Sequence, residues 1–249
     1  MKNILGFPIL ISLVMGSVIG TGIYVLPASL AQYGSISLLA WVYTSLGAVC
    51  LALTFTRLNQ RIPRTGGPYV YCKEAFGPLV GFIIACTFWG ENMVSISGLA
   101  VSSIQYVGFL IPEFDANQGM YQPHWALITE IGAVWVFTGI NIIGLRIAGL
   151  VQVFLTLIKV IPLLLIPLIG LAYIRAENFI PFVYGHTSHF TAISQAAALT
   201  FWAFIGLEAA TVPADNTQGH RDVYRATVWG TLATSFIYIF CTFVLIWLD

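Results

Sequence analysis

Charged residues are scarce in this sequence. Asp, Glu, Lys and Arg together make up 8% of the 249 residues, whereas hydrophobic residues make up 58%. An average soluble domain has about 25% charged residues. No charged residue occurs between Lys2 and Arg57, and this interval is long enough for two membrane spans of about 20 residues each. The composition therefore excludes a soluble globular domain and predicts an all-α integral membrane protein.

Residues for several other functions are also missing. The four cysteines match neither a CxxC pair nor a disulfide framework, so we expect them to be small buried hydrophobic side chains. The sequence has no HExxH or GxSxG motif, no paired metal-ligand histidines and no basic tract for nucleic acid. We therefore expect no enzymatic activity, no metal, no cofactor and no nucleic-acid partner.

Seven hydrophobic stretches predict seven membrane spans. Eight of the ten Lys and Arg residues lie on the same side as the N-terminus, and Arg175 lies alone on the opposite side. By the positive-inside rule, the N-terminus is cytoplasmic, and we expect a multi-pass protein of the inner (cytoplasmic) membrane. The expected spans are 4–30, 38–56, 79–110, 125–144, 150–173, 190–212 and 225–248.

The first span is interrupted by residues that disfavour a helix. It contains Gly16, Gly20, Gly22 and Pro27, and a glycine costs about 1 kcal/mol and a proline about 3 kcal/mol in a helix interior. Within a bilayer, broken backbone is tolerated only where it is buried in protein or lines a cavity. The stretch therefore predicts a discontinuous helix at a binding site, although small residues also serve close helix packing.

The same pattern occurs a second time in the sixth span. The dipeptide Ile-Gly at 205–206 is followed by Pro213 at the same interval at which the dipeptide at 19–20 is followed by Pro27. Interrupted spans at corresponding positions in two halves of a chain indicate the binding site of a transporter built from inverted repeats.

Four ionisable residues fall within the expected spans: Glu91, Glu130, Lys159 and Glu208. Each costs a few kcal/mol at the centre of a bilayer, so each is a functional hypothesis. Glu130 lies near the outer end of its span and fits an interfacial carboxylate. The other three are central and either form an internal ion pair, such as Lys159 with Glu208, or couple proton movement to transport. We also expect Lys159 to pair with carbonyls at the break of the first span.

An aromatic group precedes Glu208. Trp202 lies six residues before it, with Phe201 and Phe204 beside Trp202. These rings can form an aromatic wall on which a cationic group stacks, or they can serve packing alone; the sequence leaves both interpretations open.

Three motifs resemble those of the amino acid–polyamine–organocation (APC) transporters. GSVIGTGIYVLP at 16–27 resembles their first-helix signature, and PRTGGPYVY at 63–71, followed by FGP at 76–78, resembles their loop after helix 2. FWAFIGLEAA at 201–210 resembles the sixth helix of the arginine–agmatine and polyamine exchangers in this superfamily. The resemblance implies an inverted-repeat fold with discontinuous helices 1 and 6. Residues 1–249 would be one amino acid permease transmembrane domain, with helices 1–5 as the first repeat and helices 6 and 7 as the start of the second.

The resemblance also implies a site. The backbone of the first break would hold a substrate carboxylate at a half-helix N-terminus, and a carboxylate at position 91, where the exchangers often have small neutral residues, favours a substrate with an extra amine. Lys159 resembles a helix-5 lysine of other members of the superfamily, whose ammonium takes the place of a sodium ion. The sequence therefore does not decide between antiport and proton symport. The implied residues are Ser17, Ile19, Gly20, Thr21, Gly22, Glu91, Asn92, Trp202 and Ile205 for the substrate, and Glu208 and Lys159 for gating or proton coupling.

We therefore expect a transporter of a basic amino acid or its amine that works by alternating access. The alternatives are a neutral amino acid permease of the same fold and a seven-helix receptor or photosensor. A retinal photosensor needs a lysine in the last span, and 225–248 has none. Because only two helices of the second repeat would be present, we also expect residues 1–249 alone to insert without transporting, unless a homodimer or a complementing C-terminal fragment completes the fold.

Overall fold

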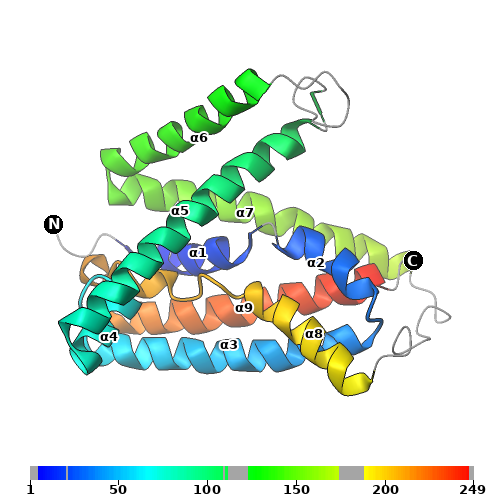
Figure 1. The fold of residues 1–249 in the computed structure, drawn as a ribbon, viewed down its shortest axis with the longest axis horizontal. Helices are drawn as coiled ribbons and strands as arrows, with labels where there is room; N and C mark the ends of the chain where they lie inside the picture. Colours follow the sequence, from blue (N-terminus) through cyan, green and yellow to red (C-terminus); the bar gives the residue numbers. More distant parts are fainter. Residues whose placement is uncertain (1–4, 21, 109, 112–122, 174–187, 247–249) are drawn as a thin grey trace. The chain divides into compact units, whose positions relative to one another are not determined.

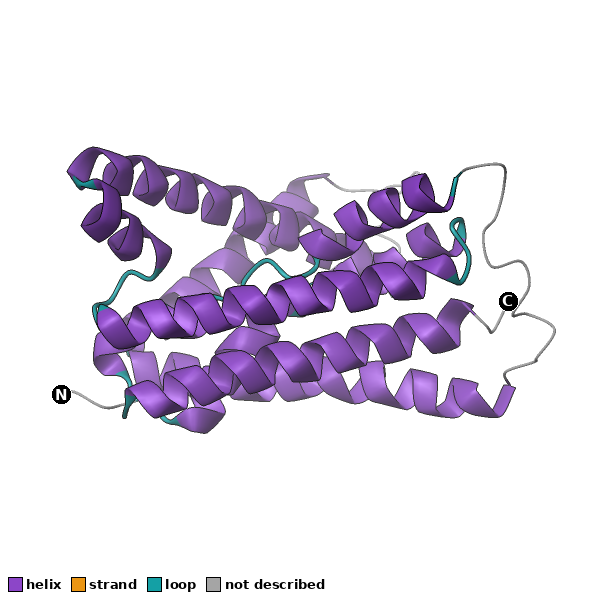
Figure 2. Ribbon diagram, turned by 90° about the horizontal axis from the view of Figure 1, so that it is seen from below, coloured by secondary structure: helices purple, strands orange, loops and turns teal. Residues whose placement is uncertain are grey.

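The structure is a computed structural model that describes residues 5–20, 22–108, 110–111, 123–173 and 188–246. Nearly all of these residues are helical, and the described part contains no strand beyond one isolated bridge between Leu5 and Thr217 (Figure 2). The chain divides into two compact units. One consists of residues 1–70 and 149–249, and the other of residues 71–148.

The first unit is a bundle in which α9 lies between α1 and α3 (Figure 1). Helix α3 also packs against α8, and α2 contacts both α8 and α9. Helix α7 begins at the boundary of the unit and continues into a short 3-10 turn at Leu171–Tyr173. The bounds are α1 Phe7–Val18, α2 Gly22–Ala31, α3 Ile36–Arg61, α7 Leu145–Gly170, α8 His189–Trp202 and α9 His220–Ile246.

The second unit contains α5 (Pro78–Gly108) and α6 (Pro123–Ile143), which pack against each other. A short helix, α4 (Pro68–Phe76), begins in the first unit and ends in the second. The segment that resembles the family's loop after helix 2 therefore contains a short helix between two expected spans. Pro68 occupies the first helical position, where its fixed φ and missing N–H suit a helix start, and Val70 and Tyr71 are buried.

The prediction of an all-α membrane protein is confirmed. Among the described residues, α3, α5, α6, α7 and α9 are each long and apolar enough to cross a membrane, and the pair α1 and α2, bent by 43°, makes up to six spans. The remaining expected span, 190–212, starts as α8 and then breaks into turns and a 3-10 helix at Ala209–Thr211. Both of the spans predicted to be discontinuous are therefore discontinuous.

Two helix contacts in the first unit correspond to each other. Helix α3 follows the first break and packs on α8, which precedes the second break; α9 follows the second break and packs on α1, which precedes the first. This exchange is the pattern expected of two repeats related by a pseudo-twofold axis.

Small and hydroxyl side chains are buried on α3 and α9, which pack against each other and against α8 and α1. Their size lets the helix backbones approach closely, as in many membrane bundles. Thr44 Oγ1 bonds to Ala40 O of its own helix at 2.9 Å and lies 3.1 Å from Thr200 Oγ1 of α8. Among the described residues, the buried hydroxyls of Ser45, Thr227 and Thr234 have no hydrogen-bond partner. The buried members are Ser37, Ala40, Thr44, Ser45, Ala48, Ala52 and Thr56 on α3, and Ala226, Thr227, Thr231, Thr234 and Ser235 on α9.

The cysteines differ from one another. Cys241 is buried, whereas Cys50 and Cys86 are exposed on α3 and α5, so the expectation that all are buried is wrong for these two. Both lie on outer faces of apolar helices, where hydrophobicity by itself does not distinguish a buried side chain from one that faces lipid.

The two breaks touch each other. In the first, the Ile19 N–H bonds to Met15 O at 2.8 Å and the Gly20 N–H bonds to Val18 O at 2.9 Å, and α2 then begins at Gly22. In the second, Gly206 has a φ of +102° and approaches the first break so closely that a Cβ on it would lie 3.0 Å from the carbonyl carbon of Ser17. Only glycine combines this backbone angle with this contact.

We predict that Gly206→Ala destabilises the protein. A side chain at this φ is strained, and the Ser17 backbone cannot move aside cheaply, so the free energy of unfolding should fall by about 2 kcal/mol. Thermal unfolding in detergent measures the change. The matched control is Gly47→Ala on α3, where a Cβ would meet nothing within 4 Å; equal melting temperatures for the two variants would contradict the prediction.

Candidate functional site at two facing helix breaks

The ends of α1, α2 and α8 provide the polar groups of the candidate site. A helix end leaves backbone groups without intrahelical partners, with partial positive charge at an N-terminus and partial negative charge at a C-terminus. Here the C-terminal ends of α1 and α8 and the N-terminal end of α2 meet within one compact unit. The arrangement offers N–H donors from α2 and carbonyl acceptors from α1 and α8.

Three side chains of α7 donate hydrogen bonds to carbonyls of α1. Gln152 Nε2 and Thr156 Oγ1 lie 3.3 Å and 3.1 Å from Ser12 O. Lys159 Nζ donates to Gly16 O at 2.8 Å and to Ile19 O at 3.0 Å. The spacing of 152, 156 and 159 places the three donors on one face of α7. The contact of Lys159 with carbonyls of the first break is the one expected from the sequence, and its part in coupling stays a prediction.

Tyr238 of α9 reaches the same region from another side. Its hydroxyl lies 2.7 Å from Val18 O and 3.4 Å from Ala203 O. Its ring packs against Trp41 and Phe204, with centroids 5.0 Å and 5.8 Å away. Tyr238 was not among the residues predicted from the sequence, although its position in the middle of an apolar span is a signal that could have identified it.

The aromatic residues before Glu208 do not form one wall. Phe204 is 2% exposed and belongs to the buried cluster with Trp41 and Tyr238. Trp202, in contrast, is 56% exposed, and its Cζ3 lies 3.3 Å from where a Cβ of Gly22 would be. The structure therefore assigns packing to Phe204 and leaves Trp202 available at the start of α2.

The other residues predicted for the substrate differ in accessibility. The side chains of Ser17 and Ile205 are exposed, and a Cβ on Gly20 would meet nothing within 4 Å. The side chain of Ile19 is buried, so its contribution is limited to its backbone. Thr21 lies outside the described residues.

Glu208 lies on the second break, before the 3-10 helix Ala209–Thr211, and is partly exposed. Its backbone carbonyl accepts from the Thr211 N–H at 2.8 Å and from Thr211 Oγ1 at 2.7 Å. These bonds shape the turn after the break. The role of the carboxylate in gating or proton coupling stays a prediction.

Glu91 and Asn92 lie on α5, in the second unit. Glu91 Oε1 accepts from Ser95 Oγ at 2.9 Å, and Asn92 Nδ2 donates to Phe88 O at 2.7 Å and lies 3.2 Å from Glu91 Oε2. The Glu91 side chain is exposed. Its proximity to a substrate at the breaks stays a prediction.

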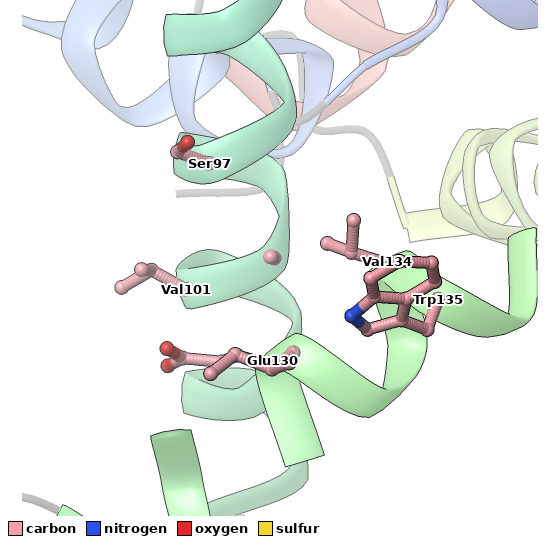
Figure 3. A pocket seen from close by; sticks show the side chains of 7 residues that line it. Ser97, Val101, Glu130, Val134 and Trp135 are labelled. Atoms are coloured by element: carbon pink, nitrogen blue, oxygen red, sulfur yellow. The ribbon is translucent and has the colours of Figure 1, made fainter. Parts of the chain in front are cut away.

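A groove of about 220 Å³ lies between α5 and α6 (Figure 3). It is mainly apolar, with one half-buried carboxylate, that of Glu130. Because it lies away from both breaks in the sequence, we do not assign it to the substrate site. The lining residues are Ser97, Ala100, Val101, Glu130, Ile131, Val134 and Trp135.

The PRTGGPYVY motif after α3 is hydrogen-bonded to the segment that follows the second break. Thr65 and Asp215 bond reciprocally: the Thr65 N–H lies 3.2 Å from Asp215 Oδ2, and the Asp215 N–H lies 3.3 Å from Thr65 Oγ1. Beside them the Gly66 N–H donates to Val212 O at 2.9 Å.

Within the described residues, no group of three or more His, Cys, Asp or Glu could hold a metal ion.

Known proteins are similar in sequence to this protein along most of the chain. The putrescine transporter PotE of Escherichia coli (strain K12) is 31% identical over 251 residues, which cover 98% of this chain and 55% of that protein. The arginine/agmatine antiporter of Chlamydia felis (strain Fe/C-56) is 32% identical over 250 residues, covering 96% and 51%. The cadaverine/lysine antiporter of Escherichia coli (strain K12) is 30% identical over 235 residues, covering 93% and 51%.

The chain thus spans about half the length of the curated relatives it matches. A family model described as amino acid permease matches residues 5–247, which is nearly the whole chain and includes both breaks. The chain belongs to the amino acid permease family.

Proposed function

We propose that this protein transports a basic amino acid or a polyamine across the cytoplasmic membrane, with its N-terminus in the cytoplasm. The observation that carries the proposal is the pair of discontinuous helices whose broken ends face each other within one unit. The relatives support the substrate class, because putrescine, arginine, agmatine, cadaverine and lysine each carry two basic groups, whereas a neutral amino acid carries one.

The helix ends suit the two ends of such a substrate. The N-terminus of α2 offers N–H donors and a positive dipole end to a carboxylate. The C-terminal end of α8 offers carbonyls and a negative dipole end to an amine, and the exposed ring of Trp202 lies beside it and can stack on a cation. In this proposal Glu91 supplies the counter-charge for a second amine.

Lys159 links protonation to the geometry of the first break. As an ammonium it donates to two carbonyls at the end of α1, and such charge-assisted bonds are stronger than neutral ones. Loss of the proton removes the charge and one donor, so the end of α1 is held less firmly. In this proposal Lys159 and Glu208 together couple proton movement to opening of the breaks.

We predict that Lys159→Met reduces uptake at least about tenfold and flattens its pH dependence, since two charge-assisted hydrogen bonds worth about 1.5–3 kcal/mol each are lost. The measurement is uptake into proteoliposomes between pH 5 and 8. Lys73→Met, an exposed lysine on α4, is the matched control. Normal proton-driven uptake by Lys159→Met would exclude the coupling role.

Glu208→Gln tests the second coupling group. The substitution keeps the size of the side chain and removes its charge, so we predict that transport loses its pH dependence while the protein still inserts. The same proteoliposome series measures this. Unchanged pH dependence would show that the carboxylate has no part in coupling.

Glu91→Gln tests the substrate class. We predict that the variant binds arginine, lysine or a diamine about tenfold more weakly, because a carboxylate–ammonium contact is worth about 1.5 kcal/mol or more, while binding of neutral amino acids stays unchanged. A binding panel of labelled amino acids and amines measures both. If the unmodified protein binds neutral amino acids with an affinity equal to or higher than that for basic ones, a neutral amino acid permease is the correct description.

A further inference from the structure

Tyr238 contacts both breaks from the buried side of the bundle. Val18, whose carbonyl it bonds at 2.7 Å, is the last residue of α1, and Ala203, whose carbonyl lies 3.4 Å from the same hydroxyl, is the first residue after α8. The hydroxyl has one proton, so the two distances describe a three-centre hydrogen bond with the Val18 carbonyl as the stronger acceptor. A single side-chain atom therefore touches the ends of both helices that stop at the breaks.

The position of this hydroxyl is determined by the ring that carries it. Tyr238 is fully buried, and Trp41 of α3 and Phe204 of the second break pack against its ring. Such aromatic packing fixes the direction of the ring, so the hydroxyl cannot follow either helix end without disturbing the cluster. The contact is therefore between three elements: α9, the end of α1 and the end of α8.

The next turn of α9 makes a related contact. Cys241 Sγ lies 2.9 Å from Leu163 O of α7, and this carbonyl has no helical N–H partner because Pro167 stands four residues later. Buried donors of α9 thus bond to carbonyls that lack the N–H partner of a continuous helix, and Val18 O also accepts from the Gly20 N–H at 2.9 Å. Tyr238 differs from Cys241 because its acceptors belong to two helices instead of one.

We propose that Tyr238 is a positioning residue whose hydroxyl holds the ends of α1 and α8 in register, so that the two breaks open together. The proposal rests on the proposed transport function only for its consequence, since a joint motion of both breaks is what alternating access requires of them. If this hydrogen bond holds both helix ends, its removal increases the mobility of both breaks, and that increase can be measured without any substrate.

The test is hydrogen–deuterium exchange of the protein in lipid nanodiscs. Tyr238→Phe keeps the ring and removes the hydroxyl, and we expect exchange to rise about fivefold both at 16–20 and at 201–205, since a net hydrogen bond is worth about 1 kcal/mol. Two variants on the same helix are controls, Cys241→Ala and Tyr224→Phe, the latter at an exposed tyrosine. Neither should change exchange at the breaks.

Two further variants separate coupling from simple capping. Both acceptors of Lys159 lie on the first break, so Lys159→Met should raise exchange at 16–20 and, through the intact Tyr238 contact, at 201–205 as well. An increase confined to 16–20 in this variant would indicate capping without coupling and would contradict the proposal. Tyr238→p-aminophenylalanine, which has two N–H donors, should restore protection at both breaks to at least the level of the unmodified protein. This rescue also decides the matter if Tyr238→Phe is recovered in too low a yield to measure.

An increase confined to 16–20 in Tyr238→Phe, or no rescue by the two-donor variant, would overturn the proposal. A parallel measurement of binding of labelled lysine and putrescine keeps the two conclusions apart. If the unmodified protein binds neither, the proposed function fails, while the exchange pattern still decides whether Tyr238 holds both breaks.

Discussion

The structure depends on one requirement: in a bilayer, every backbone polar group needs a partner within the protein. An interrupted helix violates this requirement at each broken end, and the chain meets it with side chains from neighbouring helices. Lys159 supplies donors to Gly16 O and Ile19 O, Tyr238 supplies one to Val18 O, and Cys241 supplies one to Leu163 O. The two breaks can exist because α7 and α9 are packed where these donors reach.

Close helix packing is needed for these side-chain donors to reach the carbonyls. The small residues on α3 and α9 bring the two helices together, and this fixes where the aromatic cluster of Trp41, Phe204 and Tyr238 sits. The hydroxyl bond between Thr44 and Thr200 then joins α3 to α8 directly before the second break. The packing that makes the bundle compact is thereby the same packing that positions the polar groups of the site.

The sequence was sufficient for features that leave a local signature. Charge depletion and hydrophobic length predicted the spans, and glycine within apolar runs predicted both breaks. A lone lysine in a span predicted its own contact with freed carbonyls, because few other partners exist at that depth. The prolines were less informative: Pro27 lies inside α2 and Pro213 precedes a 3-10 helix, so neither marks the break itself.

The features that could not be predicted are contacts between distant residues. Tyr238 and Val18 are 220 residues apart, and Thr65 and Asp215 are 150 apart. The position of Tyr238 in an apolar span marks it as a candidate, but nothing local in the sequence shows which carbonyls it contacts, and nothing local distinguishes Phe204 from the exposed Trp202 two residues earlier. Which of two neighbouring aromatic residues is buried depends on how the chain turns after α8, and that turn is set by contacts with α1 and α9.

The hydrogen bonds of Lys159 also disfavour a continuous helix in the first span. In an uninterrupted helix, Gly16 O would accept the N–H of Gly20, and Ile19 O would accept that of Ile23. The ammonium of Lys159 occupies both acceptors and therefore competes directly with the two hydrogen bonds that would fuse α1 and α2 into one straight rod. The interruption is thus favoured from outside the segment as well as by its glycines.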